Sequence, residues 1–162
     1  MTLHHAEPAE LVIPEPPRRG EEGGDPCFPC SPGADSTLIW SDAHWTLHNP
    51  GQTGLPGSVW LASRRHFDSF ADMPGDVAAT FAGVCGRVER AILSLGGVGR
   101  VHVYRWGDGG AHFHVWLVPR PLGRLDMNGP QLMAWEDAMD PASDEDIAQA
   151  GDRIADALRA MG

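Results

Sequence analysis

Apolar and polar positions alternate in several short runs, and this two-residue period predicts β-strands. The clearest run lies at 109–120, which begins with glycines and ends in a Pro-Arg pair. Because strand side chains alternate between faces, one face of this strand would hold His112, His114 and Trp116. The other face would hold apolar side chains and point into a core. A row of imidazoles opposite an apolar row indicates a site, although a surface histidine pair gives the same pattern.

Further strands are predicted at 37–40, 44–48, 58–63 and 99–106. The strand at 44–48 would present His44 and His48 to solvent or to a ligand. The strand at 99–106 and the run at 109–120 should be antiparallel neighbours, because only the turn at 107–110 separates them.

Apolar residues at three- and four-residue spacing predict helices after the third of these strands and near the end of the chain. The longest begins after Pro74 and ends at a pair of glycines near residue 96. A short helix is predicted over 130–139. The final helix should begin after Ser143, whose hydroxyl suits an N-cap.

The chain has 162 residues and a formal net charge of −10, which fits one modest domain with a real core. Its acidic residues gather in the flanks, whereas residues 27–125 carry eight arginines and seven acids. A balanced centre lacks the basic stripe of a nucleic-acid surface and leaves room for a small phosphorylated ligand. No apolar run is long enough to span a membrane, and the start lacks a secretory pattern, so we expect a cytoplasmic protein without membrane partners.

Residues 1–26 are rich in Pro, Glu and Gly, and we predict a flexible arm in which the pair His4 and His5 is incidental. Directly after it, Cys27 and Cys30 form a Cys-x-x-Cys pair that can reach one tetrahedral metal from a tight turn. Such a pair is half a zinc site. The alternative is a redox pair, although no strand precedes it.

Three elements in series resemble the histidine-triad superfamily, over roughly residues 27–120. The first is the Cys-x-x-Cys pair. The second is 56–66, which fits the family's Pro-Gly-His, apolar run and Pro-Lys-x-His at the same length and ends at His66, although Ser58 replaces the first histidine. The third is 112–120, which matches His-x-His-x-His-apolar-apolar-Pro-Arg except that Trp116 replaces the third histidine. One such element is weak evidence, and three at family spacing are fairly specific.

The resemblance implies a small α+β domain in which an antiparallel-dominated sheet packs against one long helix. This domain would span 27–121, between the N-terminal arm at 1–26 and a C-terminal helical extension at 122–162. Since many members form twofold dimers, the resemblance also allows a homodimer.

The resemblance further implies a zinc ion. In the zinc-containing branch, and in the related galactose-1-phosphate uridylyltransferases, the metal takes two cysteines and two histidines, which by position are Cys27, Cys30, His66 and His112. A closed set of four ligands is typical of structural zinc, which would pin the start of the domain to the active strand. The alternative is that the cysteines are free and reduced.

In this family, the middle histidine of the motif attacks the α-phosphate of a nucleotide and forms a nucleotidyl-histidine. By position, this histidine is His114 here. The resemblance therefore implies a hydrolase or nucleotidyltransferase whose partner is a nucleotide or nucleotide conjugate. A neutral imidazole suits this role, since it is a good nucleophile near pH 7. Around it, the candidate substrate-binding residues are Arg105, Gly109, Gly110, Trp116, Asn49 and Arg120.

Two departures from the family pattern leave alternatives open. The indole of Trp116 offers one N–H donor and no acceptor, so it cannot carry a proton. Arg105 and Ala111 stand near positions where members often have amide or hydroxyl side chains. One alternative is a nucleotide-binding protein of the same fold with weak or no catalysis. The other is a zinc-stapled interaction domain whose acidic flanks contact a partner.

Overall fold

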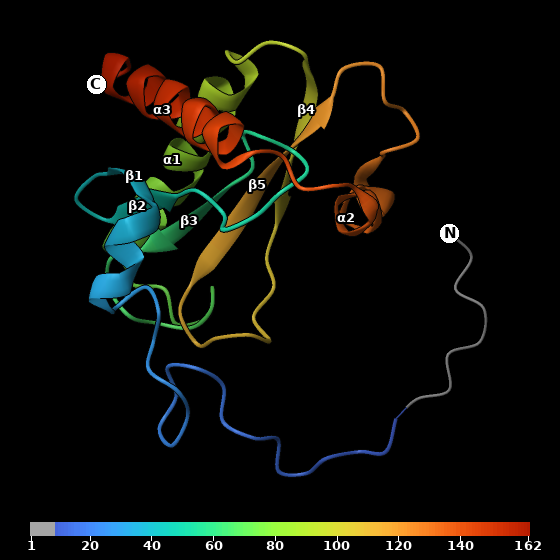
Figure 1. The fold of residues 1–162 in the computed structure, drawn as a ribbon. Helices are drawn as coiled ribbons and strands as arrows, with labels where there is room; N and C mark the ends of the chain where they lie inside the picture. Colours follow the sequence, from blue (N-terminus) through green and yellow to red (C-terminus); the bar gives the residue numbers. More distant parts are fainter. Residues whose placement is uncertain (1–8) are drawn as a thin grey trace.

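The computed structural model describes residues 9–162 and confirms an α+β fold built on one antiparallel sheet (Figure 1). His4 and His5 lie outside the described residues. The strands follow the order β1-β2-β3-β5-β4 across the sheet. In chain order the elements are the 3₁₀ helix η1 (Pro32–Thr37), β1 (Leu38–Ser41), β2 (Trp45–His48), β3 (Val59–Ser63), α1 (Gly75–Leu93), β4 (Val98–Tyr104), β5 (His114–Pro121), α2 (Gly129–Ala138) and α3 (Asp144–Ala160).

Strand β5 runs between β3 and β4 and carries most of the histidine motif. Its alternation follows the prediction, because Val115 and Leu117 are buried in the main core while His114 and Trp116 are only partly buried. The predicted strand limits were wrong at one point, since His112 precedes β5 and is not on a strand face. The chain from β4 to β5 forms the loop 105–113, which is longer than the predicted turn.

Helices α1 and α3 pack together over the sheet and complete the main core (Figure 1). The stripe of α1 includes the buried Val84 and Val88, and α3 adds Ile154 and Leu158 to the same cluster. Each such side chain stabilises the fold by about 1.5–3 kcal/mol when fully buried. At the start of α3, the Ser143 hydroxyl accepts the backbone N–H of Asp146 at 3.1 Å, as predicted for an N-cap.

A second, smaller apolar cluster lies between α2 and the sheet, and both Tyr104 and Trp116 pack against it. In Figure 1, α2 lies on the other side of β5 from α1 and α3. The Tyr104 hydroxyl donates to the Gly129 carbonyl at 2.6 Å, where α2 begins. The C-terminal segment therefore contributes to the main core through α3 and borders the neighbourhood of Trp116 through α2.

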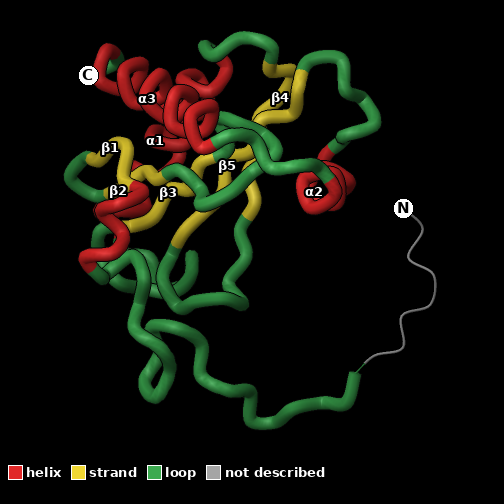
Figure 2. The backbone as a smooth tube through the Cα atoms, viewed as in Figure 1, coloured by secondary structure: helices red, strands yellow, loops and turns green. Residues whose placement is uncertain are grey.

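Residues 9–31 are drawn entirely as loop in Figure 2, yet part of this segment is attached to the domain. We call residues 18–25 the N-terminal strap. The Arg19 carbonyl accepts the N–H of Ala111 at 2.8 Å, and the Arg18 guanidinium donates to the Gly107 carbonyl at 2.7 Å. The flexibility of 1–26 and the domain limits at 26 and 121 stay predictions. No helix in the described part of the chain combines the length and apolarity needed to cross a membrane.

Candidate functional site

The four predicted metal ligands come together from three separate parts of the chain. Cys27 and Cys30 precede η1, His66 follows β3, and His112 lies in the loop before β5. Their ligand atoms all lie within 4.8 Å of one another. Only His112 of the four is fully buried, so the cluster is open to solvent on one side.

The separations within this cluster fit a tetrahedral zinc site. Nδ1 of His112 lies 3.2 Å from Sγ of Cys27 and 3.4 Å from Sγ of Cys30. Nδ1 of His66 lies 3.5 Å from Sγ of Cys30 and 3.2 Å from Nδ1 of His112. Nitrogen and sulfur ligands at tetrahedral zinc distances are about 3.3–3.8 Å apart, and the four separations are close to these values. Two sulfurs and two imidazole nitrogens are also the chemistry that structural zinc selects, so the cluster is suited to zinc.

Hydrogen bonding determines which nitrogen of His112 faces the cluster as a ligand. Nε2 lies 2.7 Å from the Ser63 carbonyl, which can only accept, so Nε2 carries the proton. Nδ1 then presents its lone pair to the cysteines. A backbone carbonyl that fixes the tautomer of a ligating histidine is the usual outer-shell arrangement at zinc sites.

Burial favours the neutral forms of the side chains in this cluster. Desolvation lowers the pKa of His112, which keeps its imidazole neutral. Burial, followed by the neighbouring Cys27 thiol, raises the pKa of Cys30 to about 11 in the absence of a metal. The thiol therefore keeps its proton until a cation displaces it, so metal binding at this cluster should release protons.

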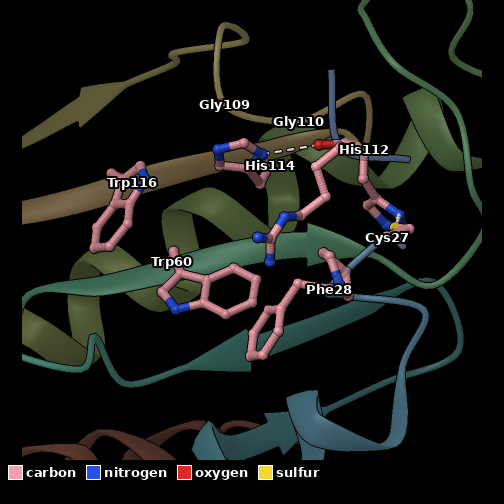
Figure 3. Close-up of a pocket in the computed structure, with 10 residues that line it drawn as sticks. Cys27, Phe28, Trp60, Gly109, Gly110, His112, His114 and Trp116 are labelled. Carbon is pink, nitrogen blue, oxygen red and sulfur yellow. Dashed lines mark hydrogen bonds between the residues drawn. The ribbon is translucent and has the colours of Figure 1, made fainter. Parts of the chain in front are cut away.

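The predicted nucleophile, His114, stands at the start of β5 beside the cluster. Its Nδ1 lies 2.8 Å from the carbonyl oxygen of His112, a contact drawn as a dashed line in Figure 3. Because a carbonyl cannot donate, Nδ1 carries the proton and Nε2 keeps its lone pair. The backbone of one histidine thus sets the tautomer of the other.

A pocket of about 220 Å³ opens beside these two histidines (Figure 3). Trp60 and Trp116 lie with ring centroids 6.5 Å apart, and Phe28 lies 6.1 Å from Trp60. These aromatic rings offer a large apolar surface beside the imidazole of His114. The lining residues are Arg19, Cys27, Phe28, Pro29, Trp60, Gly109, Gly110, His112, His114 and Trp116.

Four of the seven residues predicted for catalysis and substrate binding line this pocket, namely Gly109, Gly110, His114 and Trp116. The other three lie elsewhere. The Arg105 guanidinium donates to the Asp68 carbonyl at 2.6 Å and lies over the Phe113 ring. Arg120 donates to the backbone of Pro121 near the far end of β5. The Asn49 side chain packs against α3.

Four lining residues were missed by the sequence analysis, namely Arg19, Phe28, Pro29 and Trp60. Phe28 lies inside the Cys-x-x-Cys pair, which was considered only for its thiols. Trp60 lies on β3, where alternation alone cannot show which face borders a pocket. Arg19 belongs to a segment predicted to be flexible, and no local pattern indicates that it returns to the site.

His48 was also misjudged, because it faces neither solvent nor a ligand. It is 3% exposed and stacks on Trp60 with ring centroids 4.0 Å apart. Its Nδ1 lies 3.1 Å from the Thr37 hydroxyl. Burial lowers the pKa of His48 to about 4, so a neutral ring supports the pocket wall from behind.

No family model matches the sequence, and no curated protein matches it significantly. Solved structures do match. A hypothetical histidine triad nucleotide-binding protein from Sulfolobus tokodaii strain 7 is 16% identical with a TM-score of 0.63, over 83% of this chain and 93% of that chain. The fold is that of the histidine-triad proteins.

Two further structures with the histidine-triad fold support this assignment. A zinc-bound histidine triad family protein from Mycobacterium smegmatis is 20% identical with a TM-score of 0.56, over 76% of this chain and 84% of that chain. A uridylyltransferase mutant is 18% identical with a TM-score of 0.55, over 78% of this chain and 44% of that chain. The resemblance to the histidine-triad superfamily is confirmed at the level of the fold.

Proposed function

We propose that this chain binds nucleotides and forms a nucleotidyl-histidine on His114. The observation that carries the proposal is the hydrogen bond from Nδ1 of His114 to the His112 carbonyl. It leaves Nε2 with a free lone pair on a residue that lines the pocket. A pocket with aromatic walls suits a nucleobase, and histidine-triad nucleotide-binding proteins share the fold.

In the first step, Nε2 of His114 attacks the α-phosphorus, and the bond from phosphorus to the leaving group breaks with its electron pair. The leaving atom is oxygen in a phosphoanhydride or a nucleotide sugar and nitrogen in a phosphoramidate. The new P–N bond places positive charge on the imidazole, whose Nδ1–H already points at the His112 carbonyl. This bond strengthens as the charge develops. In the second step, water or a second phosphate attacks phosphorus, the P–N bond breaks and the neutral imidazole returns, and an attacking water releases one proton to solvent. Hydrolysis then yields a nucleoside monophosphate.

We also propose that Cys27, Cys30, His66 and His112 hold a structural zinc ion. Four protein ligands leave no open position, so the metal supplies cohesion and no catalytic water. His112 would connect the metal to catalysis, because its imidazole faces the cysteines while its carbonyl orients His114. A cytoplasmic location and a homodimer stay predictions.

The proposal is tested by incubating the protein with dinucleoside polyphosphates, nucleotide sugars and nucleoside phosphoramidates and measuring its intact mass after an acid-free quench. We expect a covalent nucleotidyl adduct in the wild type that is lost in His114→Ala. The matched control is His44→Ala, a histidine between β1 and β2 that does not line the pocket. It should keep the adduct.

A second outcome is favoured by Trp116, which lines the pocket but cannot relay a proton to the leaving group. Saturable nucleotide binding with neither adduct nor turnover would establish a binding protein and contradict the covalent step. An adduct that persists in His114→Ala would assign the nucleophile to another residue.

A further inference from the structure

The charge balance of the pocket points to one side chain outside the histidine motif. Among its lining residues in the described part of the chain, Arg19 is the only arginine, and none is a carboxylate. A phosphate that enters an apolar pocket loses hydration, so it needs a cation or several hydrogen-bond donors there. A guanidinium supplies both.

The N-terminal strap is held in place by Arg18, the neighbour of Arg19. The Arg18 guanidinium lies 2.7 Å from a carboxylate oxygen of Asp68 and 2.7 Å from the Gly107 carbonyl. It also bonds Glu21 within the strap. Arg18 is only 28% exposed, and these contacts span the strap, the segment after β3 and the loop before β5. Such a partly buried network is worth more than an isolated surface ion pair.

The backbone on either side of Arg19 is also fixed. The N–H of Ala111 donates to the Arg19 carbonyl at 2.8 Å, and Arg19 forms a parallel bridge with Gly110. Gly20 follows with a φ of +89°, and a Cβ there would lie 3.2 Å from Cε1 of His66. Only glycine adopts this φ readily. The short distance to His66 shows that the strap lies close to the metal cluster.

The guanidinium of Arg19 itself remains available for a ligand. Its ion pair with Asp25 has a separation of 4.0 Å, and both side chains are at least half exposed. Such a pair contributes little and is readily exchanged. By contrast, Arg105 bonds the Asp68 carbonyl, and Arg120 lies outside the pocket.

We propose that Arg19, delivered by the N-terminal strap, binds the phosphate of the nucleotide beside His114. This inference rests on the proposed function and adds a residue from outside the matched motifs. It adds Arg19 to the candidate substrate-binding residues, among which Arg105 and Arg120 lie outside the pocket. The strap also lies against the metal cluster at Gly20. It would therefore connect the bound phosphate, the nucleophile His114 and the metal cluster.

The experiment measures binding of AMP, GMP, CMP and UMP and of the four matching nucleosides through quenching of tryptophan fluorescence. We expect Arg19→Gln to weaken binding of the preferred nucleotide about 10- to 100-fold and to leave its nucleoside unchanged. Arg19→Lys should retain part of the nucleotide affinity, since it keeps the charge without the planar fork. The matched control Arg90→Gln, on exposed α1 surface, should change neither affinity.

The inference is overturned if Arg19→Gln keeps nucleotide affinity within twofold of the wild type, or weakens nucleotide and nucleoside equally. Loss of the same affinity in Arg90→Gln would also overturn it, because the effect would then come from net charge. If the wild type binds none of the four nucleotides, the proposed function fails and this inference fails with it. Binding that is insensitive to Arg19→Gln refutes only the role of Arg19.

Discussion

His112 performs two structural tasks with two different groups. Its imidazole is held by the Ser63 carbonyl so that Nδ1 faces the cysteines, while its own carbonyl accepts a hydrogen bond from Nδ1–H of His114. A substitution of His112 therefore removes a metal ligand without removing the carbonyl. Loss of metal and loss of nucleophile orientation are separable effects at this position.

His48 should make stability depend on pH between about 6.5 and 4. Burial lowers its pKa from 6.5 to about 4, so in this range the unfolded state binds a proton that the folded state excludes. The free energy of unfolding should fall as the pH is lowered through the window, by at most about 3 kcal/mol. Denaturant titrations of the wild type and His48→Phe, which keeps the stack on Trp60, test this.

The difference between these two proteins at pH 8 measures the change in packing together with the lost hydrogen bond to Thr37, because both rings are then neutral. Subtracting it isolates the contribution of the His48 proton. Equal slopes of stability against pH in the two proteins would refute a buried, neutral His48.

At the scale of elements, the close packing of α3 depends on a glycine within the helix. A Cβ at Gly151 would collide with the side-chain amide of Asn49. The backbone carbonyl of Asn49 in turn accepts a hydrogen bond from the Trp60 indole N–H at 3.2 Å. Helix α3 therefore packs against Asn49, whose backbone carbonyl bonds the pocket residue Trp60.

Gly151→Ala and Gly83→Ala make the same change in two helices and should have opposite effects. At Gly151 the added methyl collides with Asn49, and we expect a loss of about 1–3 kcal/mol. At Gly83 on α1 no atom lies within 4 Å of the new Cβ, so helix propensity should stabilise the protein by about 0.5–1 kcal/mol. Chemical denaturation measures both. Stabilisation by Gly151→Ala would contradict the packing of α3 on Asn49.

At the scale of the whole molecule, the four-ligand cluster connects segments far apart in the sequence. It brings residues 27–30 to the segment after β3 and to the loop before β5. These segments are mostly irregular, so few backbone ladders hold them together. A metal at the cluster would replace that missing cohesion.

Removal of zinc by a chelator should therefore lower the stability of the protein. A ligand present at about a thousand times its Kd stabilises by about 4 kcal/mol, which corresponds to a melting temperature about 8–16 °C higher in a chain of this size. Thermal unfolding with and without chelator, together with metal analysis, measures this. We expect one zinc per chain in the wild type and in Cys85→Ser, and none in Cys27→Ser. A metal-free wild type whose unfolding ignores the chelator would contradict the site.

Much of the fold follows from local pattern. The sequence predicted each of the five strands found in the described residues, and apolar spacing with cap and glycine signals predicted α1 and α3. A short helix was also predicted at 130–139, where α2 lies. The resemblance to the histidine-triad superfamily also implied the donor set of Cys27, Cys30, His66 and His112, which the structure brings together. These features depend on neighbours a few residues apart or on a motif of fixed length.

Tertiary structure decided which residues share the pocket. Arg19 and Phe28 come from a segment with no regular structure, and their positions depend on hydrogen bonds and packing against loops distant in sequence. Arg105, by contrast, lies outside the pocket and donates to the Asp68 carbonyl. The start of β5 at His114 also depends on long-range contacts, because the N–H of Phe113 just before it donates to the Phe67 carbonyl at 2.7 Å. Periodicity describes a strand face, whereas long-range contacts decide which side chains meet.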